Sequence, residues 1–265
     1  MTGMTDIEAV GDRLVGSDRV LAVLVELASH PAGATLDEMA RVTGSPKSTV
    51  HRALASLRRA GLASQDGPGH YILGDEFLRL AFTHHEARPE HVRVRPLLER
   101  LAERFGETAH FAVMDGREVV YRAKVEPPIG AVRLTSAIGG RNPVHSTGVG
   151  KALLALQLSS ERDVASWIGD RLLEARTPNT AVTPADLHAR LDQTRRRGYA
   201  IDDQENELGI NCVAFPVYLS SPTSPAGAVS VSALAYRTPL PALRESVDEI
   251  RSIIATATGI RERTA

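Results

Sequence analysis

Residues 35–62 read TLDEMARVTGSPKSTVHRALASLRRAGL, and this stretch decides the fold of the first part of the chain. Thr35 and Glu38 make the T-x-x-E pattern of a capping box, which predicts the start of a short helix. That helix is expected to end near Gly44, because glycine adopts left-handed backbone angles at no steric cost. Its predicted apolar stripe consists of Leu36, Met39, Ala40 and Val42.

A second helix is predicted to follow directly, with Ser45 as its N-cap and Pro46 at its first position, where no amide donor is needed. Its apolar residues recur at helical spacing and are predicted to point inward: Val50, Ala53, Leu54 and Leu57. The other face offers cations for phosphates, namely Lys47, Arg52 and Arg58, and groups for base edges, namely Ser48, Thr49 and His51. This arrangement is typical of a helix that enters a DNA major groove.

The charges of this stretch support a DNA-binding helix, whereas the net charge of the whole chain does not. The formal net charge of −1 gives no sign of a nucleic-acid partner. Residues 41–65, however, contain five arginine or lysine residues and no acidic residue, which is a local basic patch. The alternative is a solvated surface helix in an ordinary helical domain.

The flanking segments favour the DNA-binding interpretation. Residues 62–64 and 70–73 read as two strands around a glycine-proline turn, which predicts a β-hairpin wing. Residues 20–28 predict a first helix that ends at Pro31 and packs across the other two. We therefore predict a flexible tail over 1–16 and a winged helix-turn-helix domain over 17–74.

Length and composition bound the rest of the chain. The 265 residues suit two domains, and 43% hydrophobic content is enough for real cores. The single cysteine excludes a disulfide framework and a cysteine-based zinc site. No apolar run is long enough to span a bilayer, and the N-terminus lacks the features of a signal peptide. A cytoplasmic protein with no membrane partner is expected.

The remaining sequence predicts a linker helix over 75–88 and a second domain over 89–265. The boundary falls at Arg88-Pro89, because proline disfavours helical geometry in the residue before it. Helices are predicted over 92–105, 146–156, 185–197 and 240–259, and strands over 108–114, 118–125, 131–136, 212–219 and 226–233. This order predicts an α+β domain with a mostly antiparallel sheet.

Several longer motifs resemble the IclR family of bacterial transcriptional regulators. The N-terminal match is SDRVLAVLVELASHPAGATLDEMARVTGSPKSTVHRALASLRRAGL with the wing and YILGDEFLRLA behind it. The C-terminal match comprises NPVHSTGVGKALLA, RRRGYAIDDQENELGINCVAFPV and AVSVSA, at 142–155, 195–217 and 228–233. Together these segments cover nearly all of the chain after the tail, and their order makes the match specific.

The resemblance implies a regulator, expected to be a repressor, that binds palindromic double-stranded operator DNA. It implies a GAF-like effector-binding domain for a small organic or aromatic carboxylic acid, and homodimers that often form tetramers. No cofactor, metal or catalytic residue is expected. The effector contacts that the resemblance places in this sequence are Gly148, Val149, Asp202, Cys212, Ser230 and Ser232.

Elementary chemistry is compatible with these six positions. Gly148 and Val149 stand where a helix begins, so their free amides can hold a carboxylate. Ser230 and Ser232 are two apart on a strand, so both hydroxyls face one side. Asp202 either accepts a hydrogen bond from the ligand or caps local backbone, and Cys212 either contacts the ligand or is simply buried. Packing alone is also an open alternative for Ser230.

Other histidines and a glycine-rich run allow alternative functions to be tested. His84, His85, His110 and His145 suggest a metal, but no cysteine or carboxylate stands beside them at ligand spacing. The run GVGKA at 148–152 resembles a phosphate loop, yet the Walker pattern requires glycine at His145 and a hydroxyl at Ala152. An enzyme with a DNA-binding leader and a distal domain that only oligomerises are the two competing classes.

Overall fold

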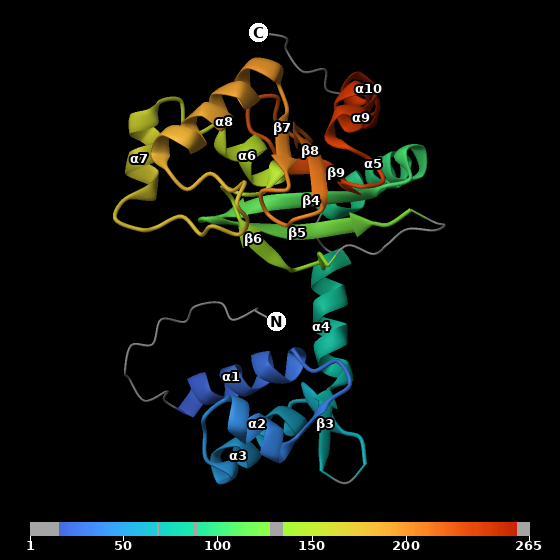
Figure 1. The fold of residues 1–265 in the computed structure, drawn as a ribbon. Helices are drawn as coiled ribbons and strands as arrows, with labels where there is room; N and C mark the ends of the chain where they lie inside the picture. Colours follow the sequence, from blue (N-terminus) through green and yellow to red (C-terminus); the bar gives the residue numbers. More distant parts are fainter. Residues whose placement is uncertain (1–15, 68, 87–88, 128–134, 259–265) are drawn as a thin grey trace. The chain divides into compact units, whose positions relative to one another are not determined.

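The computed structural model describes residues 16–67, 69–86, 89–127 and 135–258, and it is drawn in Figure 1. The chain divides into two compact units, residues 1–87 and residues 88–265. The predicted tail lies outside the described residues, except that Gly16 already belongs to the first helix. Each unit is described by itself below.

The described part of the first unit holds four helices and a small sheet. The helices are α1 (Gly16–Ala28), α2 (Leu36–Val42), α3 (Lys47–Arg59) and α4 (Asp75–Glu86), and the strands are β1 (Ala34–Thr35), β2 (Ala63–Gln65) and β3 (His70–Leu73). The strands pair antiparallel in the order β1-β3-β2. The predicted winged helix-turn-helix is therefore confirmed, with β1 as a strand that the sequence did not predict.

Local signals explain most of this unit. Thr35 and Glu38 form both halves of the predicted capping box, and Gly44 has a φ of +61°. The three helices and the wing share one apolar core, made of Val23, Leu27, Ala34, Met39, Val50, Ala53, Leu54, Leu57, Ala63 and Tyr71. The predicted stripe of α2 is wrong at Val42, which is 51% exposed. In α1 the buried residues are Val23 and Leu27, whereas Leu21 is 58% exposed.

The start of α3 differs from the prediction. Pro46 is its N-cap and Lys47 its first residue, and no side chain caps the helix. The Ser45 hydroxyl instead donates to the Thr43 carbonyl at 3.3 Å, so it is not directed at the amides of α3. The first amides of α3 are thus free of a side-chain cap.

The second unit is built on a six-stranded antiparallel sheet of order β6-β5-β4-β9-β8-β7. Its strands are β4 (Thr108–Asp115), β5 (Glu118–Val125), β6 (Arg141–Pro143), β7 (Ala200–Asp203), β8 (Ile210–Val217) and β9 (Gly227–Leu234). Its helices are α5 (Pro89–Phe105), α6 (Gly148–Leu154), α7 (Glu161–Ile168), α8 (Pro184–Arg197), α9 (Leu240–Glu245) and α10 (Val247–Thr258). The predicted α+β class and antiparallel sheet are confirmed.

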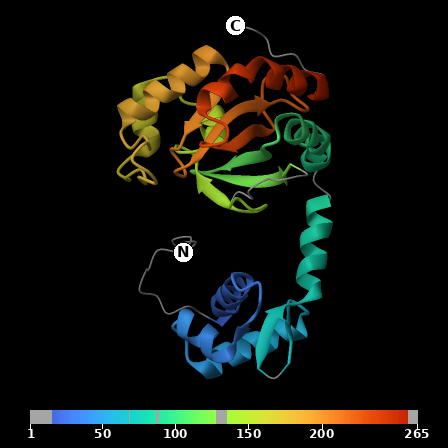
Figure 2. The same cartoon turned by 45° about the vertical axis from the view of Figure 1, so that its right-hand side comes forward.

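Helices cover both faces of this sheet (Figure 2). One face packs on α5, α9 and α10 through Phe111, Val213, Phe215, Val229 and Val231. The opposite face lies under α6, with α8 beside it, and contributes Cys212, Ala214 and Ala228. Because side chains alternate along a strand, each strand supplies both layers.

Three predicted elements of this unit are corrected. The helix expected over 240–259 breaks at Ser246 into α9 and α10. The helix expected over 146–156 is shorter, because Thr147 caps it and Ala155 ends it. Most of the strand expected over 131–136 lies outside the described residues, and Thr135 and Ser136 are not in a strand. The edge strand β6 and helix α7 were not predicted.

Candidate DNA-binding helix and effector pocket

Helix α3 presents the predicted DNA-contacting side chains on its outer surface. Its inner face is fully buried through Val50, Ala53, Leu54 and Leu57. Of the six predicted DNA contacts, Thr49 is half-buried and five are exposed: Lys47, Ser48, His51, Arg52 and Arg58. The amphipathic helix therefore orients a basic, hydroxyl-bearing face away from the core, as a groove-binding helix requires.

One of these cations already has a partner. Lys47 Nζ lies 2.8 Å from the Asp37 carboxylate of α2, and both side chains are about two-thirds exposed. Exposed ion pairs contribute little free energy because water and salt screen them. A phosphate can therefore replace Asp37 as the partner of Lys47 at small cost.

A cavity of about 220 Å³ lies in the second unit between the sheet and the start of α6. A water molecule occupies roughly 30 Å³, so the space suits a small organic molecule rather than a single water. All six residues that the resemblance suggested line this cavity. The structure thus brings together positions that are up to 84 residues apart in the chain, and their role in ligand binding stays a prediction.

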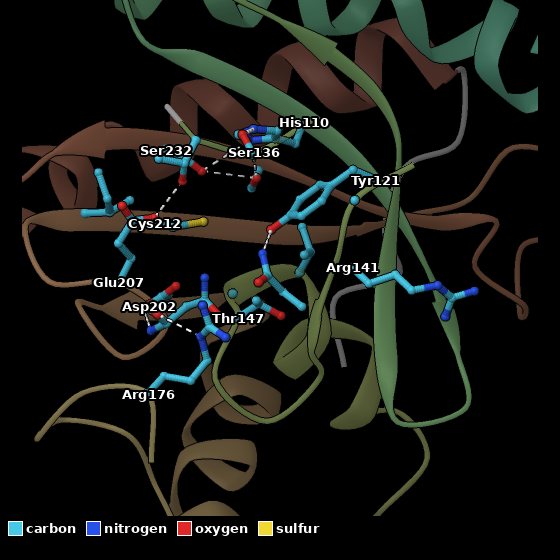
Figure 3. Close-up of a pocket in the computed structure, with 18 of the residues that line it drawn as sticks. His110, Tyr121, Ser136, Arg141, Thr147, Arg176, Asp202, Glu207, Cys212 and Ser232 are labelled. Atoms are coloured by element: carbon cyan, nitrogen blue, oxygen red, sulfur yellow. Dashed lines mark hydrogen bonds between the residues drawn. The ribbon is translucent and has the colours of Figure 1, made fainter. Parts of the chain in front are cut away.

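The sheet supplies one wall of the cavity as a polar row. Asp202 pairs with Cys212 across β7 and β8, and Cys212 pairs with Ser232 across β8 and β9. On the next strand, His110 pairs with Ser230. Directly opposed residues share a face, so these side chains all point to the cavity side, as Figure 3 shows for the labelled members.

The start of α6 forms a second wall of the cavity, next to the polar row of the sheet. The Thr147 hydroxyl accepts the Gly150 amide at 3.1 Å, while the amides of Gly148 and Val149 have no intrahelical acceptor. Gly148 must be small, because a Cβ there would lie 2.9 Å from Cys212 Sγ. The backbone of α6 can therefore approach the sheet closely only with glycine at this position.

Asp202 is tied to the backbone and also faces the cavity. Its Oδ1 accepts the amides of Glu205 at 2.7 Å and Asn206 at 3.3 Å, so the capping alternative raised from the sequence is correct. Burial raises the pKa of Asp202 to about 7, although the positive charge of Lys151 acts in the opposite direction. A carboxyl group that titrates near neutral pH therefore lines the cavity.

The other polar groups of the wall are neutral. Burial lowers the pKa of His110 to about 3, and the charge of Lys124 acts in the same direction. Burial also raises the pKa of the Cys212 thiol to about 12 and that of the Tyr121 phenol to about 12. At pH 7 these side chains can donate and accept hydrogen bonds without carrying charge.

A buried ion pair anchors α6 behind the cavity. Lys151 Nζ lies 2.5 Å from Glu205 Oε1, and each side chain is 2% exposed. Arg190 Nη1 of α8 lies 3.0 Å from the same oxygen. The lysine of GVGKA is thus committed to a carboxylate, which agrees with rejecting a phosphate loop.

The metal hypothesis gains no support from geometry. Within the described part of the chain, no three histidine, cysteine or acidic side chains are grouped as metal ligands. His110 hydrogen-bonds Ser136, and His145 hydrogen-bonds the Glu174 carbonyl. The side chains of His84 and His85 lie outside the described set. Among the described helices, none combines the length and apolarity of a membrane span.

Two family models together match most of the chain. The model described as "Bacterial transcriptional regulator IclR C-terminal" matches residues 91–258, and the "IclR helix-turn-helix domain" matches residues 17–67. The chain belongs to the IclR family. Its members regulate transcription, and the helix-turn-helix of the first unit is their DNA-binding domain.

Individual relatives agree with this family. The transcriptional repressor IclR of Escherichia coli K12 is 35% identical over 217 residues, which cover 81% of this chain and 78% of the relative. The crystal structure of Thermotoga maritima IclR has a TM-score of 0.74 at 26% identity, covering 93% of this chain and 97% of that one.

One further solved structure shares the fold of this chain. An IclR homolog from Microbacterium hydrocarbonoxydans, crystallised with 4-hydroxybenzoate, has a TM-score of 0.72 at 22% identity. That likeness covers 93% of this chain and all of the other.

Sequence reasoning missed part of the pocket of this IclR-family chain. His110 and Tyr121 line the cavity, as do Ser136, Thr147 and Arg176. A signal for His110 was present, because it is the polar residue between the apolar Ala109 and Phe111 in a predicted strand. The sequence alone suggested only a metal-binding role for His110.

Proposed function

We propose that this chain represses transcription by binding a palindromic operator, and that a small carboxylic acid in the cavity changes its affinity for that DNA. The observation that supports the proposal is that this one chain contains both a DNA-binding domain and a ligand-sized cavity. An exposed basic helix belongs to a winged helix-turn-helix, and a cavity lined by polar side chains lies in a separate unit. A homodimer would present two copies of α3 to successive major grooves, and dimers would pair into tetramers.

The DNA contacts divide by chemistry. Lys47, Arg52 and Arg58 are placed on phosphates, because their side chains are long and cationic. The shorter hydrogen-bonding side chains of Ser48, Thr49 and His51 are placed near base edges. All but Thr49 are exposed, which supports the assignment.

The acid is placed with its carboxylate at the start of α6. Gly148 and Val149 line the cavity at the first turn of α6, where amides have no intrahelical acceptor. Arg176 lies at the same end of the cavity as Thr147, the N-cap of α6 (Figure 3). Arg141 cannot serve, because it pairs with Asp115 and Glu118 and points away from the cavity. The protein that was crystallised with 4-hydroxybenzoate shares only the fold with this chain. We therefore use 4-hydroxybenzoate as one test compound for the cavity.

Control of DNA binding requires a difference in affinity. The acid must bind one arrangement of the subunits more tightly than another, and the operator must prefer the other. A coupling of 1–3 kcal/mol would change operator affinity by roughly 5- to 150-fold.

The DNA half is tested by fluorescence anisotropy with the intergenic DNA upstream of the gene, against a scrambled duplex, over a salt series. Tight binding to the native fragment, with weak and steeply salt-dependent binding to the scramble, is expected. The variant Arg52→Ala is expected to bind the native fragment more weakly, and Arg100→Ala, an exposed change on α5, is its matched control. Failure to bind either duplex at low salt would refute the proposal.

The effector half is tested by calorimetry and thermal stabilisation with a panel of small monocarboxylates. The variant Arg176→Ala, which removes the cation at the α6 end of the cavity, is expected to lose stabilisation by the acid while it keeps DNA binding. Unchanged acid affinity in that variant would show that the pocket is misplaced. Recovery of the acid intact after incubation separates an effector from a substrate, and a domain that only oligomerises would show no acid-dependent shift.

A further inference from the structure

Three polar atoms form a small triangle on the wall of the cavity. His110 Nδ1, Ser230 Oγ and Ser232 Oγ lie 3.4 Å from one another on all three sides. The three residues are at most 7% exposed, and all line the cavity. These separations are at the outer limit of hydrogen bonding, because bonds that involve a hydroxyl are shortest and strongest near 2.8 Å.

The triangle leaves hydrogen-bonding capacity unused. Buried polar groups ordinarily have well-formed partners, and each unmet group costs free energy. Simple geometry shows where a partner fits: an oxygen about 2 Å above the plane of the triangle would lie ~2.8 Å from all three atoms, the length of a good hydrogen bond. The cavity lies on that side of the sheet.

The chemistry of the three atoms selects the kind of oxygen. His110 is neutral because burial lowers its pKa to about 3, so it has one ring donor and one ring acceptor. Its Nε2 lies 2.8 Å from Ser136 Oγ. When Nε2 donates to Ser136, Nδ1 is an acceptor, and the two serine hydroxyls are donors. A ligand hydroxyl has one hydrogen and two lone pairs, so it satisfies all three atoms at once.

The triangle lies away from the start of α6, so the ligand hydroxyl that it binds is distant from the carboxylate of the proposed acid. Asp202, Cys212 and Ser232 are register partners on three adjacent strands, and α6 starts above Cys212. Strands lie about 4.8 Å apart, so Ser232 is one to two strand spacings, roughly 5–10 Å, from the α6 end. Figure 3 shows His110, Ser136 and Ser232 at one end, and Asp202, Thr147 and Arg176 at the other.

We propose that the triangle of His110, Ser230 and Ser232 recognises a hydroxyl group at the end of the effector opposite its carboxylate, so that the effector is a hydroxy acid with its two groups far apart. The inference rests on the proposed function, because it assumes that the cavity binds an acid. It adds a second recognition point and assigns His110 as the residue that selects the hydroxyl. Ser136 positions the ring by accepting from Nε2.

Two matched pairs of probes test this by calorimetry on the full chain: benzoate against 4-hydroxybenzoate, and pentanoate against 5-hydroxypentanoate. At least one hydroxylated member should bind 10- to 100-fold more tightly than its parent acid, as expected when a buried site is built to hydrogen-bond a hydroxyl. The variants are His110→Phe and the double change Ser230→Ala, Ser232→Ala. Each should reduce the hydroxy acid to the affinity of its parent and leave the parent unchanged. Ser252→Ala, an exposed change on α10, is the control.

The outcomes separate two kinds of failure. Equal affinity for both members of each pair overturns the inference and leaves the acid-binding pocket intact. Equal loss of parent and hydroxy acid in the serine variant also overturns it, because the serines would then hold the carboxylate. No binding by any of the four acids overturns the proposed pocket itself, and the inference with it. The serine variant removes only two small hydroxyls, so it remains informative if His110→Phe does not fold.

Discussion

Replacing Lys151 with methionine should destabilise the second unit by about 3–5 kcal/mol, because it leaves a buried carboxylate without its nearest partner. At the 2.5 Å separation from Glu205, the attraction is roughly 7 kcal/mol for an effective dielectric constant near 20. Desolvation of the two ions offsets much of that attraction in the folded state. Arg190 remains 3.0 Å from Glu205 in the variant, so the lower end of the range, about 3 kcal/mol, is expected.

Urea denaturation followed by tryptophan fluorescence measures this effect in the right unit. Trp167 of α7 is the single tryptophan of the chain, and it lies in the second unit. The double variant Lys151→Met, Glu205→Gln should be more stable than the single variant, since it removes the unpaired charge. Lys47→Met, which breaks the exposed pair with Asp37, should leave this transition in place. A loss below about 1 kcal/mol for Lys151→Met, or a double variant as unstable as the sum of its parts, would refute the reasoning.

Three further changes give separate tests. Arg52→Ala should weaken operator binding by about 1–3 kcal/mol if the side chain reads a base, and weaken every DNA alike if it contacts phosphate, as an anisotropy comparison of operator and scramble decides. The pKa of Asp202 is about 7 in the folded state and about 3.8 in the unfolded state, so the folded state binds this proton more tightly. The protonated carboxyl group therefore contributes fully to the free energy of unfolding below pH 3.8, and this contribution is lost as the pH rises to about 7. That contribution is on the order of 4 kcal/mol, and urea titrations of Asp202→Asn should show no such loss between pH 4 and 7. Gly148→Ala should cost about 1–3 kcal/mol by the same fluorescence assay, because its Cβ would meet Cys212 Sγ at 2.9 Å; an unchanged midpoint would contradict this.

The first unit could be predicted closely because its signals are local. The capping box of Thr35 and Glu38, the left-handed Gly44 and the helical spacing of the α3 core each act within a few residues. The error at Ser45 is also local, since its hydroxyl has two nearby backbone groups to choose between and bonds the Thr43 carbonyl. Propensity alone does not decide that competition.

The pocket was predicted in part, and the missing part depends on contacts between distant strands. His110 meets Ser230 through a pairing that spans 120 residues, and nothing near His110 in the sequence encodes that register. The same holds for Lys151 and Glu205, whose pairing requires α6 and the loop after β7 to meet. The resemblance supplied six pocket positions, but the neutral hydrogen-bonding end of the cavity became visible only in three dimensions.

Along β9, the cavity residues Ser230 and Ser232 alternate with the core residues Val229 and Val231, and β4 places His110 between Ala109 and Phe111. A side chain on the cavity side can therefore change its chemistry without altering the core behind it. An insertion or deletion within the strand, in contrast, would turn every following residue to the opposite side and exchange lining for core. Descendants of this chain can thus acquire a differently lined cavity through point substitutions in these strands, whereas changes of length must be confined to the loops.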